Sequence, residues 1–253
     1  MRLTFLGTGG SFGTPMIGCQ CPVCKSQNPK DQRLRSSVII ETDKTRLLID
    51  CGPDFRQQAL RISFRRIDGV LLTHSHYDHI GGIDDLRPFC KFGRINLYSD
   101  SITAESLKHS FPYCFDKEKY PGVPDISLTV IEPHNILHIG DIDTVPITVM
   151  HDKLPVLGYR FGRLAYITDM KTIYEGEFHY LDGVEILVIN ALRFERQHHS
   201  HQLVDDAIRF SRCIGAQHTY LIHSCHNIGL HDEVNKILPK GFEMAYDGQI
   251  IDF

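Results

Sequence analysis

The stretch Thr73-His74-Ser75-His76-Tyr77-Asp78-His79-Ile80-Gly81-Gly82 places three imidazoles and one carboxylate within six positions. It begins where a short apolar run ends, so we expect the cluster at the end of a buried strand. Neutral imidazole and carboxylate together are ligands for zinc, iron and manganese. With the chain extended at its start, His74 and His76 project to one side, and Asp78 and His79 on the following turn can reach a second ion. Such a density of ligands has no packing rationale and predicts a metal centre.

Four other short β-rich runs end on a residue of the same kind. These residues are Asp50, His151, Asp169 and His223. Because strand ends on a rigid scaffold can present ligands on one rim, we expect them to converge with His74 on a single site. Asp50 is expected to orient a ligand or the adjoining loop. The pair Gly81-Gly82 lets the backbone pass close by without a side chain in the way.

The pattern of elements along the 253 residues indicates one mixed domain over 1–253. Short β-rich runs occur in consecutive groups in both halves, and helix-like stretches lie at 54–64, 203–214 and 230–238. This grouping favours two packed sheets with helices outside over a strict alternation of strand and helix. The predicted fold class is therefore α+β.

The net charge and the lack of long apolar runs limit which binding partners and which cellular compartment we expect. The 27 Lys and Arg residues against 31 Asp and Glu residues give a net charge of −4, which offers no broad footprint for nucleic acid or an anionic membrane. The N-terminus lacks the apolar region of a secretory signal, and no run approaches the ~18 residues of a membrane span. We expect a cytoplasmic protein with a small-molecule substrate, no nucleic-acid platform and no membrane partner. In that compartment the eight Cys residues indicate metal binding rather than disulfides.

A second candidate metal site lies near the N-terminus, where Cys19, Cys21 and Cys24 place three thiols within six residues. This density suits tetrahedral thiolate coordination and leaves one position to fill. The candidates for the fourth ligand are His226 and its neighbour Cys225. A Cys₃His site is closed, so we expect a structural rather than a catalytic ion.

The motif His-x-His-x-Asp-His at positions 74–79 resembles the signature of the metallo-β-lactamase fold superfamily. The resemblance extends along the chain, because His151, Asp169 and His223 match the remaining ligands of the family in order and in strand-end context. It implies an αββα sandwich of two mixed β-sheets flanked by helices. It also implies two catalytic ions bridged by Asp169. One ion would be held by His74, His76 and His151, and the other by Asp78, His79 and His223.

The N-terminal thiols after the Gly7–Gly10 turn, together with a C-terminal His-x-x-His, resemble the PhnP-type group of phosphoribosyl cyclic phosphate phosphodiesterases. That resemblance implies one structural zinc held by the three thiols and His226, and it allows a homodimer. In the group, a histidine just before the helix expected at 203–214 assists at the substrate phosphate. His201 is the best match and His199 the second, so both are expected to bind substrate.

The ligand pattern and the resemblance together predict a dinuclear metal-dependent hydrolase. The expected substrate is a small phosphodiester, with a cyclic ribose phosphate as one candidate, cleaved by a hydroxide shared between two zinc or manganese ions about 3.5–4 Å apart. Asp78 and His201 are the predicted catalytic residues. The alternative is an acyl hydrolase of thioesters, lactones or lactams, because the same hydroxide attacks acyl carbon. A di-iron redox protein would instead carry a carboxylate at the position of His76.

Overall fold

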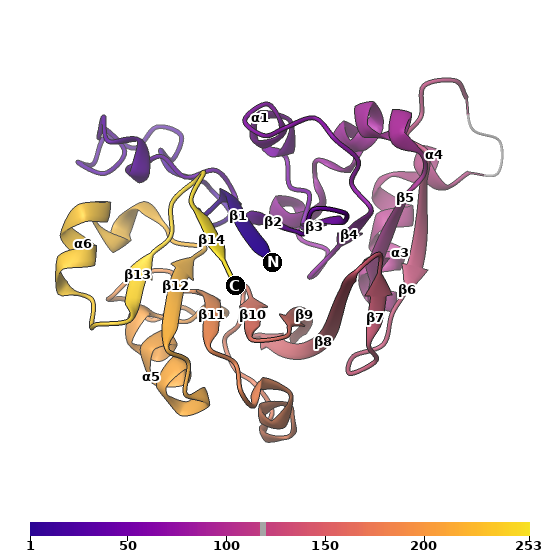
Figure 1. The fold of residues 1–253 in the computed structure, drawn as a ribbon. Coiled ribbons are helices and arrows are strands. Elements are labelled where there is room, and N and C mark those ends of the chain that lie inside the picture. Colours follow the sequence, from indigo (N-terminus) through magenta and orange to yellow (C-terminus); the bar gives the residue numbers. More distant parts are fainter. Residues whose placement is uncertain (117–119) are drawn as a thin grey trace.

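The computed structural model describes residues 1–116 and 120–253, and in this part of the chain two seven-stranded sheets pack together (Figure 1). The first sheet has the order β14 (Ile250–Asp252), β1 (Arg2–Gly7), β2 (Ser37–Glu41), β3 (Arg46–Ile49), β4 (Gly69–Leu71), β5 (Ile95–Ser99), β6 (Ile126–Val130). The second has the order β13 (Phe242–Met244), β12 (His218–Ile222), β11 (Ile186–Asn190), β10 (Leu164–Ile167), β9 (Leu154–Phe161), β8 (Ile142–His151), β7 (Leu137–Ile139). Both sheets are mixed, since strands β3 to β6 and β10 to β13 are parallel and the others are antiparallel.

Helices lie on the outer faces of both sheets (Figure 1). Those of the first half are η1 (Pro29–Asp31), α1 (Phe55–Ala59), α2 (Tyr77–Ile80), η2 (Ile83–Phe92), α3 (Ser101–Ser110) and α4 (Pro112–Phe115). Those of the second half are η3 (Glu175–Leu181), α5 (Val204–Ile214), η4 (His226–Ile228) and α6 (His231–Ile237). The predicted α+β class, with two mixed sheets flanked by helices, is confirmed.

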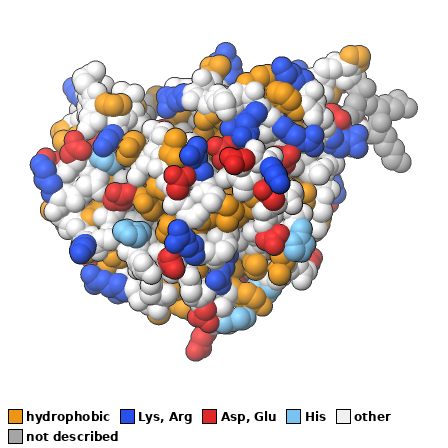
Figure 2. Space-filling model, in the orientation of Figure 1, with side chains coloured by type: hydrophobic (Ala, Val, Ile, Leu, Met, Phe, Trp, Pro, Cys, Tyr) orange, Lys and Arg blue, Asp and Glu red, His pale blue; other side chains and the backbone are white. Residues whose placement is uncertain are grey.

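The surface mixes both signs of charge. On the face shown in Figure 2, acidic and basic side chains are interspersed among polar and apolar ones. Among residues 1–116 and 120–253, no helix combines the length and the apolar character that crossing a bilayer requires.

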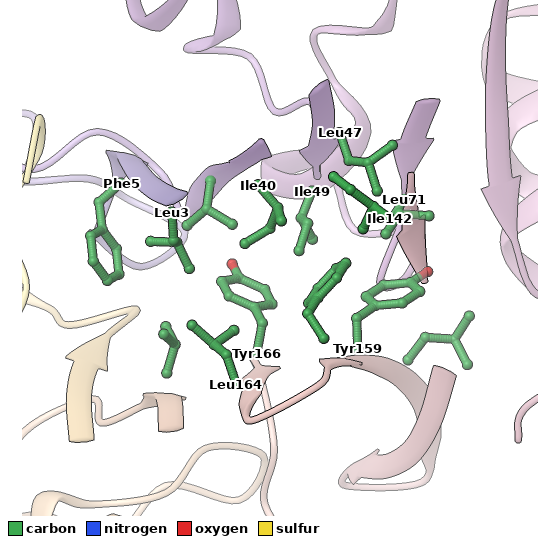
Figure 3. Packing of buried hydrophobic residues seen from close by; sticks show 14 of the residues in the cluster. Leu3, Phe5, Ile40, Leu47, Ile49, Leu71, Ile142, Tyr159, Leu164 and Tyr166 are labelled. Carbon is green, nitrogen blue, oxygen red and sulfur yellow. The ribbon is translucent and has the colours of Figure 1, made fainter. Parts of the chain in front are cut away.

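The core explains why the strands are apolar on both faces. In β2, Val38 and Ile40 point between the sheets, where they meet Tyr159 and Tyr166 of the second sheet (Figure 3). Ile39 lies between them in sequence and packs on the other face, under the helices of the first half. Since successive strand residues point to opposite faces, a sheet covered on both sides buries every residue of such a run.

The sequence predicts a helix over 54–64, but α1 contains only Phe55–Ala59, so the predicted helix was too long. The chain leaves the helix and brings Ser63 to Arg46 on β3. The Arg46 guanidinium donates to the Ser63 carbonyl oxygen at 2.8 Å and to its hydroxyl at 3.0 Å, which satisfies a buried charge. The other two expected helices are present as α5 and α6, and α5 ends before Gly215, whose φ of 75° is left-handed as a helix C-cap requires.

An irregular N-terminal segment, residues 8–36, crosses the edge of both sheets between β1 and β2. Gly9 forms bridges to Arg35 and to Ser224, so the segment connects the first sheet to the end of β12. The fully buried Arg33 ties it down, donating to Thr8 Oγ1 at 2.8 Å and meeting His231 Nδ1 at 3.2 Å. The segment is thereby held over the edge at which the parallel strands end.

Candidate metal centre

Buried side chains from five strands meet at one edge of the sandwich. They are Asp50 after β3, His74 after β4, His151 at the end of β8, Asp169 after β10 and His223 after β12. Three have a left-handed backbone, with φ of 59° at Asp50, 57° at Asp169 and 53° at His223. Non-glycine residues rarely adopt this conformation, and it is typical of functional sites that the surrounding structure holds in place. The predicted convergence of strand ends is therefore seen in the structure.

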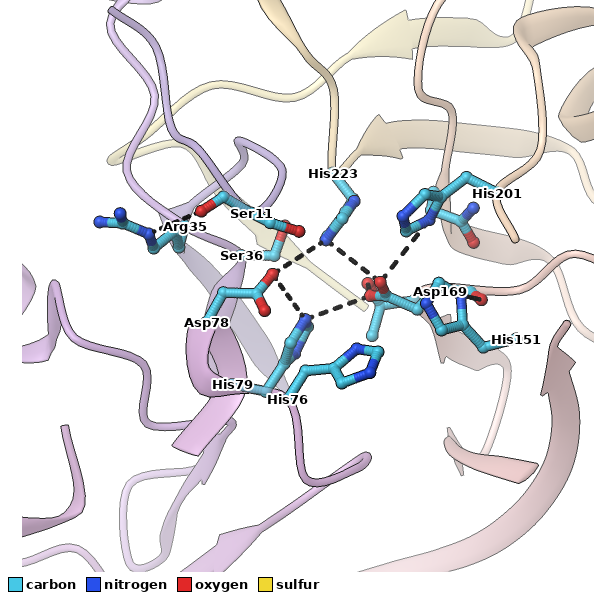
Figure 4. Close-up of polar contacts among 12 residues, drawn as sticks. Ser11, Arg35, Ser36, His76, Asp78, His79, His151, Asp169, His201 and His223 are labelled. Atoms are coloured by element: carbon cyan, nitrogen blue, oxygen red, sulfur yellow. Dashed lines mark hydrogen bonds and ion pairs between the residues drawn. The ribbon is translucent and has the colours of Figure 1, made fainter. Parts of the chain in front are cut away.

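Asp169 lies at the middle of the cluster (Figure 4). Its carboxylate oxygens lie 3.2 Å from His79 Nε2 and 3.2 Å from His223 Nε2. Asp78 Oδ2 approaches the same two nitrogens at 3.3 and 3.5 Å. Carboxylates and imidazoles therefore alternate around one small buried space.

The histidines expected at a first ion close the other side of the cluster. His74 Nε2 lies 3.0 Å from His76 Nδ1, and the rings of His76 and His151 have centroids 5.2 Å apart. The structure thus brings all seven predicted ligands together. His201 also enters, with Nδ1 3.6 Å from Asp169 Oδ1, whereas His199 is exposed and stacks on His198 outside the cluster.

Hydrogen bonds behind the cluster fix which ring nitrogen faces it. Asp50 accepts from the Thr73 amide at 2.8 Å and from His79 Nδ1 at 2.7 Å, which leaves His79 Nε2 for the site. His151 Nδ1 similarly faces the carbonyl oxygens of Asp169 and Ser200, at 2.8 and 2.9 Å. Such partners are typical of metal-binding imidazoles, whose orientation they set.

The loop behind the cluster depends on two glycines. A Cβ on Gly82 would overlap the carbonyl oxygen of Gly52, and a Cβ on Gly52 would overlap that of Asp78. The close backbone approach expected at Gly81-Gly82 is therefore present at Gly82, where the chain packs against Gly52. This contact supports the turn that carries Asp78 and His79.

The donor set fits divalent cations. Within the described residues, no contact with hydrogen-bond geometry satisfies buried His79 Nε2, His201 Nδ1 or either ring nitrogen of His223, although carboxylate oxygens lie near three of these four nitrogens. Leaving a buried polar atom unsatisfied costs about 1–3 kcal/mol, and a metal ion at this position would remove that cost. Nitrogen and carboxylate oxygen donors are the ligands that zinc and manganese accept.

Electrostatics point the same way. Burial alone would raise the pKa of Asp169, but His223 and His79 hold it well below its usual value. Burial opposes charge on His79 too, yet Asp78 and Asp169 outweigh it and raise the pKa of His79 well above the ordinary range. The two carboxylates therefore stay ionised and favour positive charge between them. Burial and the neighbouring His223 lower the pKa of His201 to about 2, so its ring is neutral at physiological pH.

A second group of donors lies in the N-terminal segment. Single ligand atoms of Cys19, Cys21, Cys24 and His226 all lie within 4.8 Å of one another. His226 Nδ1 is 3.2 Å from Cys21 Sγ and 3.5 Å from Cys19 Sγ, whereas the alternative Cys225 is not in the group. Three sulfurs and one nitrogen match the ligands of a closed tetrahedral zinc site.

Backbone amides donate to two of these thiols, with opposite outcomes: the Cys21 thiol is easier to ionise, whereas burial and the neighbouring thiols raise the pKa of Cys24 to about 11. The Cys24 amide donates to Cys21 Sγ, and the Met16 amide donates to Cys24 Sγ, both at 3.4 Å. Burial opposes ionisation of Cys21, but the Cys24 amide and His226 outweigh it and lower the pKa of the Cys21 thiol to about 6. A thiolate is the form that binds a metal.

A cavity of about 260 Å³ lies between the two donor groups. It is lined by His201 and His223 of the cluster, by His226 of the second group, and by residues that the sequence analysis did not select. Among these are Phe12, Met16, Leu192, Arg193 and His198. An aromatic residue inside the glycine-rich turn after β1 was a usable signal for Phe12, but nothing in the sequence marks Arg193.

Comparison with known proteins agrees with this geometry. The model of the beta-lactamase superfamily domain matches residues 45–224. A crystal structure titled as a new diphosphatase from the PhnP family superposes on all of this chain and 97% of its own, with a TM-score of 0.92 and 38% identity. The chain belongs to the PhnP family of the metallo-β-lactamase fold.

Curated relatives of this PhnP-family chain are longer proteins. An octanoyltransferase of Porphyromonas gingivalis is 42% identical over 98% of the chain, which covers 51% of that protein. A ribonuclease Z of Methanococcus maripaludis is 27% identical over 65% of the chain, which covers 49% of that protein. The chain thus spans about half the length of the curated relatives it matches.

Proposed function

We propose that this chain is a metal-dependent hydrolase that cleaves a P–O bond in a small phosphodiester. The observation that carries the proposal is the cluster of five imidazoles and two carboxylates, all buried except His76, with His201 beside Asp169, in a fold shared along its whole length with a PhnP-family diphosphatase. Divalent ions held by these ligands, together with the N–H of His201, would stabilise the negative charge that develops on phosphoryl oxygens.

The proposed ligands are those that the family resemblance implies. His74, His76 and His151 would hold one zinc or manganese ion, Asp78, His79 and His223 the second, and Asp169 both. Two divalent ions supply charge neutralisation and lower the pKa of water, the nucleophile that phosphoryl transfer requires. The thiols of the N-terminal segment and His226 would hold a structural zinc.

His201 is proposed to position the substrate phosphate. Its ring lies against both His151 and His223, with centroid distances of 4.6 and 4.9 Å, so it borders the cluster and the cavity together. A neutral imidazole carries one N–H, which can donate a hydrogen bond to a phosphoryl oxygen or to the leaving oxygen. Asp78 contributes by keeping its carboxylate ionised beside His79 and His223.

A diphosphate is the second candidate substrate, favoured by Arg193 and by the similarity to a PhnP-family protein that is named a diphosphatase. Arg193 lines the cavity, and its guanidinium donates to the carbonyl oxygens of Glu195 and Arg196 in the same loop. Among the described residues it forms no ion pair with a carboxylate. Its charge is therefore available to a second phosphate group next to the one at the cluster.

The experiment compares substrates on protein reconstituted with zinc or manganese. A chromogenic phosphodiester, a nucleoside diphosphate, an octanoyl thioester and a β-lactam are tested under identical conditions. Selective, metal-dependent cleavage of the diester supports the proposal, and cleavage of the diphosphate favours the second candidate. Hydrolysis of only the thioester or the lactam contradicts both and supports the acyl hydrolase alternative, to which the octanoyltransferase relative gives weight.

A further inference from the structure

Most of the wall of the cavity beside the cluster is formed by residues that are neither proposed metal ligands nor phosphate-positioning groups. His201 and His223 form part of its wall, so a phosphate held at the cluster would direct its substituent into this space. The volume of about 260 Å³ is close to the lower end of small-molecule sites, which are about 300–1,000 Å³. The cavity has room for one compact ring system.

Phe12 gives this cavity an aromatic wall. Its side chain is 73% exposed although it is one of the largest apolar residues of the chain. It lies on a tight turn, in which the Gly13 amide donates to the Gly10 carbonyl oxygen at 2.8 Å. The next residue, Thr14, pairs with Arg33 through two backbone hydrogen bonds of 2.9 and 2.7 Å. The ring is thus presented from a fixed turn rather than from a loose loop.

Apolar atoms continue around the cavity from Phe12. Leu192, which is 8% exposed, and the half-buried Met16 line the same space. Apolar surface that faces a cavity beside a polar reaction centre is typical of a site that recognises the organic part of a ligand. Aromatic and thioether side chains favour contact with a flat ring in particular.

We propose that this cavity is the subsite for the organic substituent of the substrate, and that it binds a flat aromatic ring packed on Phe12. The inference rests on the proposed function, because it places the phosphate at the metal cluster. It adds the class of substrate, namely a phosphate compound that carries an aromatic group close to its phosphorus.

Two non-hydrolysable anions test the subsite by binding alone. Phenylphosphonate and methylphosphonate share the phosphonate group and differ in the ring, and each is titrated calorimetrically into zinc-loaded protein. We expect phenylphosphonate to bind about tenfold more tightly, as stacking on an aromatic side chain allows. Phe12→Ala should reduce that preference to about twofold without changing the affinity for methylphosphonate, and Phe12→Tyr should preserve it.

The matched control is Ile17→Ala, which removes an apolar side chain that is 95% exposed in the same segment but does not line this cavity. It should leave both affinities unchanged. Equal binding of the two phosphonates, or an equal loss of both in Phe12→Ala, would overturn the subsite alone. Binding of neither phosphonate would contradict the proposed function and the subsite with it. If Phe12→Ala does not fold, the ratio measured on the unsubstituted protein decides.

Discussion

The two donor groups of this molecule differ in what holds them. The cluster around Asp169 consists of imidazoles and carboxylates at the ends of strands, nearly all of them fully buried and supported by the core beneath. The thiol group lies in the irregular segment 8–36, where Cys19 and Cys21 are partly exposed and no regular strand supports them. The sheets therefore hold the ligands of the first group in place. In the second group, a bound metal would itself hold the irregular segment 8–36 in place.

Asp169→Ala should break the first group most completely. Loss of the carboxylate that faces His79, His201 and His223 removes the proposed shared ligand, so we expect a drop in turnover of about 10³-fold or more. Turnover is measured with the best substrate, and bound metal by elemental analysis, where the metal of the thiol site should remain. Asp205→Ala, on the exposed first turn of α5, is the control and should behave like the unsubstituted protein. Unchanged turnover in Asp169→Ala would refute the assignment.

His201→Ala separates positioning from metal binding within the same cluster. We expect a fall in kcat of about 10²-fold with unchanged metal content, because the ring borders the site but is not among the proposed ligands. The comparison variant is His199→Ala, whose exposed ring should alter kcat by less than about threefold. A loss of metal in His201→Ala would show that His201 is a ligand instead.

Cys21→Ser tests whether the second group contributes to stability rather than to turnover. We expect the melting temperature to fall by about 5 °C or more, since a structural metal contributes directly to folding. Differential scanning calorimetry gives the shift, and turnover per folded molecule should change by less than about tenfold. Cys213→Ser, which replaces an exposed thiol on α5, should leave melting unaltered. Full zinc content with unaltered melting in Cys21→Ser would contradict the structural role.

The smallest effect concerns the attachment of the N-terminal segment. Burial, followed by the Arg33 charge, lowers the pKa of His231 to about 4. The unfolded chain then binds more protons than the folded one between about pH 6.5 and 4, so stability falls as the pH decreases through that window. We expect a contribution on the order of 1–2 kcal/mol, measured as the pH dependence of chemical unfolding. His231→Gln should flatten this dependence; an identical slope would exclude His231 as its source.

The convergence of the candidate ligands could be predicted from the sequence because most of them follow recognisable strands. The runs before His74, Asp169 and His223 are apolar on both faces, and their short length and their β-branched and aromatic residues indicate buried strands. The strands β7, β13 and β14 were not expected, because they are three residues long and carry no periodic signal. The longer strand β9 was not expected either, since Pro155 and Gly158 interrupt its apolar run. The helix α3 was also missed, since its polar sequence gives only Thr103, Ala104 and Leu107 to the interior.

Long-range contacts explain the rest of what the sequence could not give. The early end of α1 goes with a contact to a residue that precedes it in the chain, because the Arg46 guanidinium donates to the carbonyl oxygen and the hydroxyl of Ser63. The choice between His199 and His201 depends on which ring reaches Asp169 across the sheet edge, and two histidines of similar spacing offer no local signal. The cavity likewise joins Phe12 to Leu192 and Arg193, which are distant in sequence.

The left-handed backbone at Asp50, Asp169 and His223 has a consequence for laboratory evolution. At these positions the chain keeps ionisable side chains buried on a conformation that glycine adopts without steric strain and that uncharged asparagine tolerates as well as aspartate does. A library screened only for heat resistance in the presence of a chelator should therefore enrich asparagine at 169 and lose catalysis. The same library screened for turnover should retain aspartate at 169. At this edge of the sandwich, selection for thermal stability and selection for catalytic turnover therefore favour different residues.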